Sequence, residues 1–304
     1  MRREMTRDLS LSEQQESLLS MHSVLNVMNT VMMELLNLSD TIGEHPALER
    51  AQDVVEEVSE DLRDSERGAD HLSAADTLAE ELSTLVEEAV SSQPGAADRE
   101  EVKESRENLH TILRILRIRA EELVERSREP EAWVEYDINE LKQKFFEVLS
   151  AIEQNSHGGY RFVFNLASQE ERDYFVNLEV TSVRGDFIHV PPVVQDVMRD
   201  LIANARKYTA PGGRILAGLD EDSGRLRFVV EDSGRGIPSD ELHEVIEFGY
   251  RGSNVQNRPT RGGGFGLTKA FSTMRRLGGR MWIDSEIDEG TRIEIEVPHP
   301  RETS

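Results

Sequence analysis

Four short motifs follow one another in the C-terminal half of the chain, and each belongs to a different kind of secondary-structure element. They are RDLIANARKYT at 199–209, VEDSGRGIP at 230–238, RGGGFGLTKAF at 261–271 and GTRIEIEVP at 290–298. Their apolar spacing predicts, in this order, a helix, a strand that ends in a turn, a glycine loop that opens a helix, and a further strand. Each motif alone is weak evidence, but the four in this order predict a nucleotide-binding site.

The first motif lies on a helix predicted from about Val193 to Tyr208. Asp200, Asn204 and Lys207 are three or four residues apart and therefore share one face of that helix. An amide oxygen is a hard metal ligand and an ammonium group attracts phosphate, so this face suits a magnesium–triphosphate group. A solvated helix face with an isolated asparagine explains the same residues when the motif is taken alone.

The second motif joins a strand predicted at Leu226–Val230 to the turn that follows Glu231 and Asp232. A carboxylate at a strand end accepts hydrogen bonds, and the neighbouring glycines, Gly234 and Gly236, leave room for a flat ring. Asp232 is therefore a candidate acceptor for the exocyclic amine of adenine. Taken alone, an ordinary Asp-Ser-Gly turn is the simpler explanation.

The third motif is a glycine loop, in which Gly262, Gly263, Gly264 and Gly266 precede a helix predicted to end near Leu277. The N–H groups at a helix start have no intrahelical acceptor, and with the helix dipole they favour phosphate. A flexible linker or a dinucleotide fold also contains such glycines. The dinucleotide fold is disfavoured because a polar stretch precedes the loop where that fold has a strand.

Residues from about 133 to 298 resemble the ATP-binding catalytic domain of bacterial sensor histidine kinases, within the superfamily of gyrase, Hsp90 and MutL. ANARKYT resembles the N box, EDSGRGIP the G1 box and GGGFGLTKAF the G2 box. FGYRGSN resembles the lid segment, and DEGTRIEIEVP the last strand pair. The resemblance implies an α/β sandwich in which one mixed sheet carries a layer of helices, with ATP held between helix and lid.

The resemblance also implies a role for each matching residue. Asn204 would bind Mg²⁺ and Lys207 would bind phosphate. Tyr208 would lie against the adenine, Asp232 would accept a hydrogen bond from its N6 amine, and Thr291 would lie near its edge. Five glycines would let the backbone approach the nucleotide: Gly234, Gly236, Gly262, Gly264 and Gly266.

One position departs from the usual pattern of histidine kinases. The first N-box residue, often asparagine in that family, is Asp200 here. The ATP-hydrolysing relatives carry an acid at this position. ATP hydrolysis by a water molecule activated by Asp200 is therefore a further expectation.

Composition limits the class of protein. A chain of 304 residues is expected to form two domains, and the absence of cysteine excludes disulfides and thiol chemistry. No apolar run approaches the roughly 20 residues that span a bilayer, and the charged residues 1–10 are unlike a signal peptide. We therefore expect a soluble cytoplasmic protein. The net charge of −24 argues against a nucleic-acid partner.

Local positive charge would have to offset this acidity around ATP. Six basic residues near the motifs are candidates for that role: Arg206, Lys207, Arg251, Arg258, Arg261 and Lys269.

Residues 9–129 lack strand patterns and predict four helices with apolar stripes, at about Leu9–Leu38, Ala47–Asp64, Ser73–Val90 and Val102–Ser127. Such stripes pack on one another, which predicts an antiparallel helical bundle. The expected fold is thus a helical dimerisation and phosphotransfer domain (1–130), with an inserted helical pair at about 44–97. An α/β ATP-binding domain (131–298) and a polar tail (299–304) follow.

The segment LLSMHSVLNVMNTVMMELL (18–36) resembles, more weakly, the histidine box of histidine-kinase dimerisation domains. This resemblance implies that His22 accepts the γ-phosphoryl group and that Asn26 orients water when a response regulator is dephosphorylated. Ser23 stands where the family usually has an acidic general base, so the local residues favour phosphatase chemistry over efficient autophosphorylation. A polar stripe facing solvent is the alternative explanation, and His110 is a second candidate acceptor.

The leading hypothesis is a soluble two-component histidine kinase that uses ATP and Mg²⁺ to phosphorylate His22 and acts on the receiver domain of a response regulator. We expect a homodimer through the N-terminal helices, because the Met- and Leu-rich stripe of the first helix is longer than its intrachain partners. A bundle closed within one chain would instead be similar to the mitochondrial pyruvate-dehydrogenase-type kinases, which phosphorylate serine. A third hypothesis is a non-catalytic, ATP-sensing scaffold.

Overall fold

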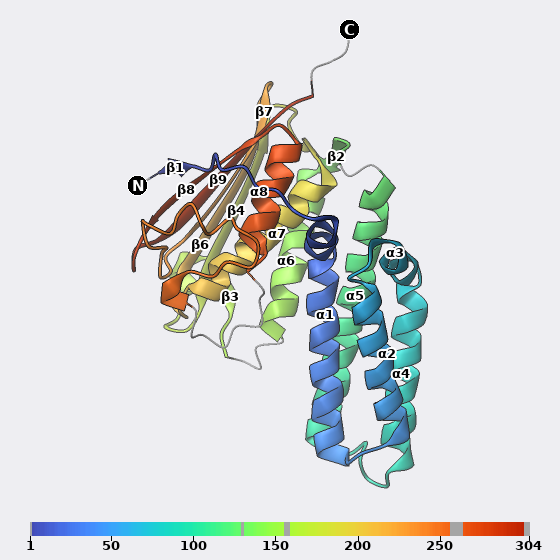
Figure 1. Cartoon of the computed structure of the whole chain (residues 1–304). Helices are drawn as coiled ribbons and strands as arrows, with labels where there is room; N and C mark the ends of the chain where they lie inside the picture. Colours follow the sequence, from blue (N-terminus) through green and yellow to red (C-terminus); the bar gives the residue numbers. More distant parts are fainter. Residues whose placement is uncertain (1, 129–130, 155–158, 256–263, 301–304) are drawn as a thin grey trace. The chain divides into compact units, whose positions relative to one another are not determined.

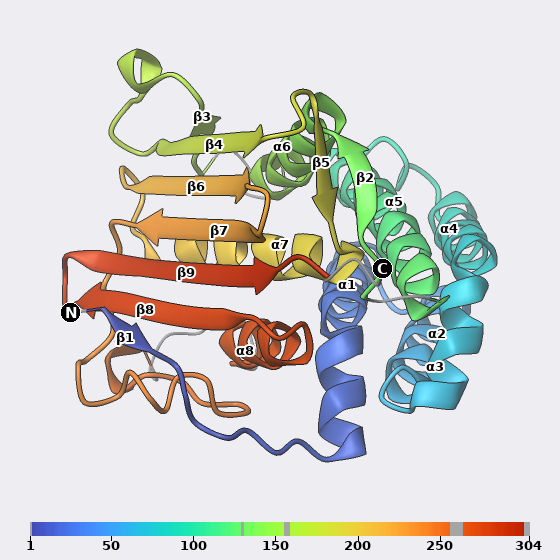
Figure 2. The same cartoon turned by 90° about the horizontal axis from the view of Figure 1, so that it is seen from above.

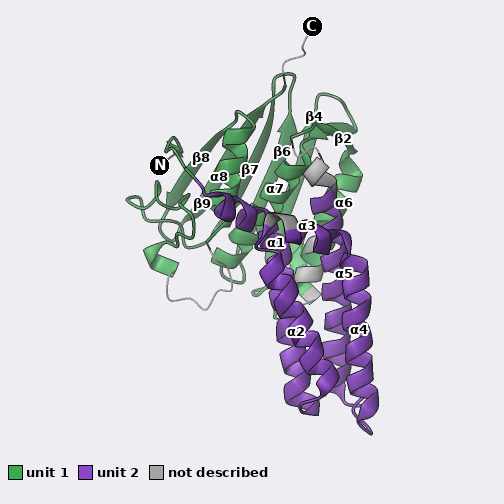
Figure 3. Ribbon diagram, turned by 45° about the vertical axis from the view of Figure 1, so that its right-hand side comes forward, with its two compact units in different colours: residues 1–10, 130–304 green, residues 11–129 purple. Residues whose placement is uncertain are grey.

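The computed structural model describes residues 2–128, 131–154, 159–255 and 264–300, and it divides into two compact units (Figure 3). The helical unit comprises residues 11–129, and the sheet unit comprises residues 1–10 and 130–304. The chain passes from the helical unit to the sheet unit near residue 130. Residues 1–10, which the sequence assigned to the helical domain, belong to the sheet unit and add a strand to its sheet.

The helical unit contains α1 (Glu13–Ile42), α2 (Pro46–Asp61), α3 (Ser65–Ser73), α4 (Ala75–Ser92) and α5 (Glu100–Arg128) (Figure 1). Four of these helices contact one another in a closed cycle, α1 with α2, α2 with α4, α4 with α5, and α5 with α1. The bundle is therefore completed within one chain. The short α3, which the sequence did not predict, contacts all four, so the predicted helical pair at about 44–97 contains three helices.

The helix α1 shows why its sequence forms this element. Ser12 and Gln15 form a capping box, in which the Gln15 N–H donates to Ser12 Oγ at 3.2 Å and the Ser12 N–H donates to Gln15 Oε1 at 2.9 Å. One apolar stripe of α1 is buried in the bundle, as Met28, Val31 and Leu35 show with 0% exposure. Leu36 of the same helix stays 42% exposed. The homodimer itself stays a prediction.

The main sheet of the other unit has the order β1-β8-β9-β7-β6-β4-β3. Its strands are β1 (Arg3–Glu4), β3 (Phe162–Val163), β4 (Tyr174–Ser182), β6 (Arg214–Glu221), β7 (Arg225–Asp232), β8 (Arg280–Glu286) and β9 (Gly290–Pro298). The pairs β3–β4 and β4–β6 are parallel and the others antiparallel, so the sheet is mixed. A separate antiparallel pair consists of β2 (Val134–Asp137) and β5 (Phe187–Val190).

Three helices lie on one face of the sheet: α6 (Ile138–Gln154), α7 (Pro192–Tyr208) and α8 (Gly266–Arg276) (Figures 1 and 2). Alternate residues of β7 point into this core, as Leu226, Phe228 and Val230 do with 2% exposure or less. Between them, Arg227 pairs with Glu294 of β9 at 2.9 Å. The predicted α/β sandwich is confirmed, and it brings the ends of α7 and β7 close to the start of α8.

Candidate functional site

The start of α8 lies directly against the side chain of Asn204 on α7. A Cβ atom added to Gly266 would lie 2.4 Å from Asn204 Nδ2, so a larger residue there would displace the amide group. Phe265, the N-cap residue of α8, gives no side-chain hydrogen bond to the first turn. The structure thus places an amide side chain beside a helix start that no side chain caps, an arrangement that suits a phosphate group and its metal ion.

Positive charge gathers around Lys207, near the end of α7. Burial lowers the pKa of Lys207, and the neighbouring charges of Arg251 and Arg206 lower it further. The Lys207 ammonium lies 5.2 Å from the centroid of the Tyr208 ring. Because cations that crowd together are stabilised by an anion, this cluster favours phosphate binding. Arg251 belongs to the FGYRGSN segment, so both sequence regions contribute charge to one place.

The carboxylate of Asp232 lies at the end of β7, opposite Thr291 in the pairing of β7 with β9. Burial raises the pKa of Asp232 to about 6, although hydrogen bonds from the N–H groups of Gly234 and Thr291 act in the opposite direction. The Gly234 N–H donates to Asp232 Oδ1 at 2.8 Å. At neutral pH the group is ionised in a largely desolvated place, where a further donor such as an adenine amine is favoured.

The glycines around Asp232 also permit contacts within the protein. A Cβ atom on Gly234 would lie 2.6 Å from the Tyr208 carbonyl, and one on Gly236 would lie 1.9 Å from the Glu286 carbonyl. Because these residues have no side chain, the turn after β7 packs closely against the end of α7 and against the β8–β9 hairpin. That they also let the backbone approach a nucleotide stays a prediction.

Gly290 is a site residue that the sequence analysis missed. Its φ is +118°, and a Cβ atom there would lie 1.9 Å from the carbonyl oxygen of Asp232. Such a φ is rare for residues with a side chain. Gly290 opens the GTRIEIEVP motif, and a glycine before a predicted strand was the signal that could have identified it.

The segment with the sequence FGYRGSN (248–254) is fixed to the turn after β7 and to the start of α8. Asn254 Nδ2 donates to the carbonyl of Gly236 at 3.0 Å. The rings of Phe248 and Phe265 lie 4.7 Å apart. Gly264 has a φ of +77°, and a Cβ atom there would lie 2.6 Å from the Tyr250 carbonyl. Gly262, Arg258 and Arg261, also predicted near ATP, lie outside the described residues.

Asp200 is paired with a lysine of α8. Lys269 Nζ lies 2.8 Å from Asp200 Oδ2 and 3.5 Å from Asp196 Oδ2, and Lys269 is only 6% exposed. The ammonium group engages one of the two oxygens of the Asp200 carboxylate and links α8 to α7. Activation of water by Asp200 and binding of phosphate by Lys269 stay predictions.

The helical unit carries the candidate phosphoacceptor. On α1, His22 is half-buried and Asn26, one turn later, is exposed. The His22 Nε2 and Asn26 Nδ2 atoms lie 3.1 Å apart, so the two side chains share one face as predicted. His110 is exposed on α5.

Residues 189–301 match the protein family described as histidine kinase-, DNA gyrase B-, and HSP90-like ATPase. This part of the chain is therefore an ATP-binding domain of the histidine kinase type, and the resemblance found in the sequence is confirmed. Among the described residues, we find no helix with the length and apolar character that crossing a membrane requires.

Several curated proteins are similar to this chain. The sensor histidine kinase WalK of Bacillus subtilis is 27% identical over 157 residues, which are 51% of this chain and 23% of WalK. The adaptive-response sensory kinase SasA of Synechococcus elongatus is 32% identical over 128 residues, 41% of this chain and 33% of SasA. The sensor protein SrrB of Staphylococcus aureus is 31% identical over 107 residues, 35% of this chain and 18% of SrrB. The matches thus span a third or less of each relative's length.

Two solved structures are also similar to parts of this chain. The mycobacterial sensor histidine kinase MprB has 24% identity and a TM-score of 0.39 over 54% of this chain and 97% of that chain. Full-length ShkA in complex with AMPPNP has 19% identity and a TM-score of 0.42 over 74% of this chain and 45% of that chain.

Proposed function

We propose that the chain is a two-component histidine kinase that transfers the γ-phosphoryl group of ATP to His22 and then to a response-regulator receiver domain. The observation that carries this proposal is the contact of Asn204 with the start of α8, in a unit that also contains Lys207 and Asp232. The other unit of the chain contains His22 beside Asn26. The names of the relatives, which describe sensor kinases, support it.

The residues at the site fit a magnesium ion that is held mainly by phosphate. Mg²⁺ commonly takes one or two oxygen ligands from the protein and the rest from phosphates and water. Asn204 offers one amide oxygen, and no group of three or more His, Asp or Glu in the described part of the chain is arranged to hold a metal. When bound there, Mg²⁺ would neutralise phosphate charge.

The residues of the chain bind the nucleotide and accept its phosphoryl group. Asp232 accepts from the adenine amine, while Lys207, Arg251 and the N–H groups at the start of α8 hold the phosphates. A ring nitrogen of His22 attacks the γ-phosphorus and forms an N–P bond. The bond from that phosphorus to the bridging oxygen breaks, and ADP leaves with the electron pair. The proton on the other ring nitrogen passes to water.

Asn26 adds a second activity to the proposal. Its amide lies one turn from His22 and is exposed, as a group that orients water for regulator dephosphorylation would be. Asn26→Ala is expected to slow dephosphorylation of a phosphorylated receiver domain and to leave labelling of His22 intact. Loss of labelling in this variant would contradict this division of roles.

Two further parts of the proposal concern assembly and cellular location. Homodimerisation through the N-terminal helices would use apolar side chains that the bundle leaves exposed, such as Leu36 at 42% and Ile118 at 43%. Sedimentation at increasing concentration tests it. We also propose that the protein is soluble and cytoplasmic, because ATP and a receiver-domain partner would be available to it there.

A protein-serine kinase is the second candidate function, and one specific observation favours it. The four long helices close a bundle within one chain, which is the architecture that the sequence analysis connected with pyruvate-dehydrogenase-type kinases. A non-catalytic ATP-sensing scaffold is the third candidate, because Ser23 replaces the usual acid after His22.

Labelling with γ-labelled ATP distinguishes the three candidates. A histidine kinase gives acid-labile label that His22→Ala abolishes and that His110→Ala, a matched change of an exposed histidine in the same unit, leaves unchanged. Acid-stable label on the chain or on a protein substrate supports the serine kinase. Tight ATP binding without any label supports the scaffold. Retention of acid-labile label in His22→Ala would refute the assignment of the acceptor.

A further inference from the structure

The residues that precede the acceptor helix are built into the sheet of the ATP-binding unit. β1 pairs antiparallel with β8 at the sheet edge, with Arg3 opposite Ile283 and Glu4 opposite Trp282. The ladder continues past the strand, because the Met5 N–H donates to the Met281 carbonyl at 2.9 Å. Met5 is 3% exposed and belongs to the core of this unit. The segment is therefore anchored by both backbone and apolar contacts.

Side chains extend this anchoring on both sides of β1. Glu4 forms two hydrogen bonds with Arg280, at 2.8 and 2.5 Å. The Arg2 guanidinium pairs with Glu294 at 3.1 Å, and Leu9 packs against the apolar core. Ion pairs at the surface are weak because water and salt screen them. The buried Met5 side chain loses its contact with water and is therefore the main anchor.

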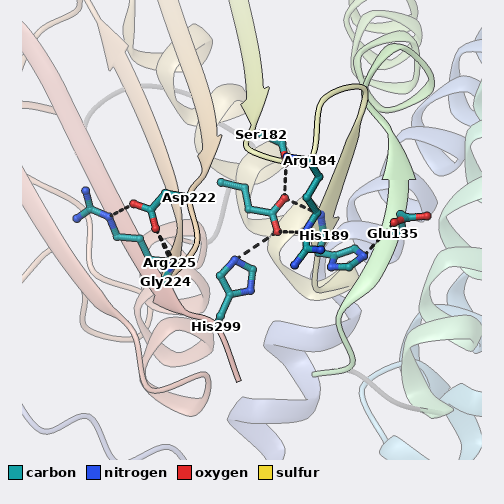
Figure 4. A network of polar contacts seen from close by, with 9 residues as sticks. Glu135, Ser182, Arg184, His189, Asp222, Gly224, Arg225 and His299 are labelled. Atoms are coloured by element: carbon teal, nitrogen blue, oxygen red, sulfur yellow. Dashed lines mark hydrogen bonds and ion pairs between the residues drawn. The ribbon is translucent and has the colours of Figure 1, made fainter. Parts of the chain in front are cut away.

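The chain that leaves the helical unit after α5 is also fastened to the sheet unit. The ring of Trp133 lies 4.3 Å from that of His299, and β2 pairs with β5 from Val134 to Asp137. His189 on β5 lies 3.2 Å from Glu135 on β2 (Figure 4). The buried carboxylate of Glu221 accepts hydrogen bonds from three groups around it: Ser182 Oγ, Arg184 Nε and the His189 N–H.

Both connections are short, and they leave the same end of the bundle. Residues 10–12, three in number, separate Leu9 from α1, and residues 129–133, five in number, separate α5 from β2. Fully extended, these connections reach about 11 and 18 Å. Arg99, just before α5, donates to the Thr41 carbonyl near the end of α1 at 2.9 Å, so α5 returns antiparallel to α1.

We propose that residues 2–9 are a second tether, which ties the acceptor helix to the ATP-binding unit of its own chain and makes His22 of that chain the substrate. This inference rests on the proposed phosphorylation of His22. One connection would leave the bundle free to turn in every direction. Two short connections leave fewer arrangements open to it than one connection would. The local concentration of His22 around its own ATP site then far exceeds that of His22 on other chains.

Complementation between inactive chains tests the tether. An Asn204→Ala chain retains His22 but lacks the ATP site, and a His22→Ala chain retains only the ATP site. With the tether intact, the mixture should give almost no acid-labile label, and the wild-type labelling rate should not change on dilution. With Glu4→Arg and Met5→Asp added, the rate within one chain should fall on the order of tenfold, and the mixture should gain label as concentration rises.

The control is the pair Glu4→Arg with Arg280→Glu, which exchanges the charges, keeps Met5 and should behave as wild type. Fast labelling of the mixture with the tether intact would overturn the proposal. Hydrogen exchange tests docking without phosphorylation, because the Met5 amide should exchange slowly in wild type and fast in Glu4→Arg/Met5→Asp. Fast exchange in wild type would refute the tether, whereas slow exchange with no acid-labile label at all would refute the histidine kinase and, with it, transfer to His22.

Discussion

At the scale of single residues, Asp232 determines how ATP binding depends on pH. Burial raises its pKa to about 6, and the ionised form accepts a hydrogen bond from the adenine amine more strongly than the protonated form does. ATP affinity should therefore be constant above pH 6 and weaken by up to about tenfold for each pH unit below it. Calorimetric titration at several pH values measures this.

Asp232→Asn is the matched control, because it keeps the shape of the side chain and removes the titration. It should bind ATP weakly at every pH and retain only the pH dependence that ATP itself contributes. A wild-type curve with the same slope as that of Asp232→Asn would contradict the role given to this carboxylate.

The same carboxyl group should lower the stability of the nucleotide-free protein. Its pKa is raised from 3.8 to about 6 on folding, so between these values the folded state binds more protons. The free energy of unfolding therefore falls as pH rises from about 4 to about 6 and is constant above. Asp232→Asn should stabilise the sheet unit at neutral pH by on the order of 1–3 kcal/mol, measured by thermal or urea unfolding. If Asp232→Asn were less stable than wild type, the hydrogen bonds to the ionised Asp232 carboxylate would outweigh the cost of its burial.

At the scale of elements, the ion pair of Lys269 and Asp200 couples α8 to α7. Lys269→Met leaves the buried Asp196 and the partly exposed Asp200 with less positive charge, which should cost up to about 3–5 kcal/mol in the free energy of unfolding and weaken ATP binding. The double variant Asp200→Asn/Lys269→Met restores the charge balance and should recover part of the loss. Equal losses in the single and double variants, measured by urea unfolding, would show that the two residues are not coupled.

The β8–β9 hairpin holds the end of β7 through Gly290. Gly290→Ala forces a Cβ atom against the Asp232 carbonyl in a backbone conformation that alanine rarely adopts. We expect ATP affinity to fall at least tenfold, together with a loss of stability of about 1–3 kcal/mol. Gly185→Ala is the control, because Gly185 also has positive φ, of +78°, but has open space around it. Equal effects on ATP binding would contradict the contact-based explanation.

The elements that local sequence encodes were predicted well. The helix from Val193 and the strand at Leu226–Val230 lie within one or two residues of α7 and β7, because the period of their apolar residues is a property of neighbouring positions. The histidine and asparagine of α1 share a face for the same reason.

What the sequence missed depends on residues far apart in the chain. β1 has only two residues and is a strand because β8, more than 270 positions later, offers its edge, as the Glu4–Arg280 pair shows with a separation of 276. The pairing of Lys269 was missed because nothing in its own motif reveals Asp200, which is 69 positions away. The backbone groups that Gly234, Gly236 and Gly290 approach are likewise far away in the sequence, so the motifs did not reveal these contacts.

At the scale of the whole molecule, the two units have separate apolar cores, and this should be visible in unfolding. Calorimetry should resolve two transitions, of which Mg²⁺ and ATP shift only that of the sheet unit. At a ligand concentration of about 100 times Kd the shift corresponds to roughly 2.7 kcal/mol. Leu35→Ala, in the core of the bundle, should lower only the other transition, by about 2–5 kcal/mol. A single transition that both changes shift equally would mean that the cores unfold as one.

The chain contains two tryptophans, and each stands at one of the two places where the helical unit is fastened. The guanidinium carbons of Arg2 and Arg280 lie 4.8 and 4.9 Å from the centroid of the Trp282 ring, and the Trp133 ring lies against His299. Release of either fastening would transfer one indole to bulk water and shift its ultraviolet emission. Trp133→Phe and Trp282→Phe separate the two signals. The intrinsic fluorescence then reports, without an attached dye, whether either connection is released during a catalytic cycle.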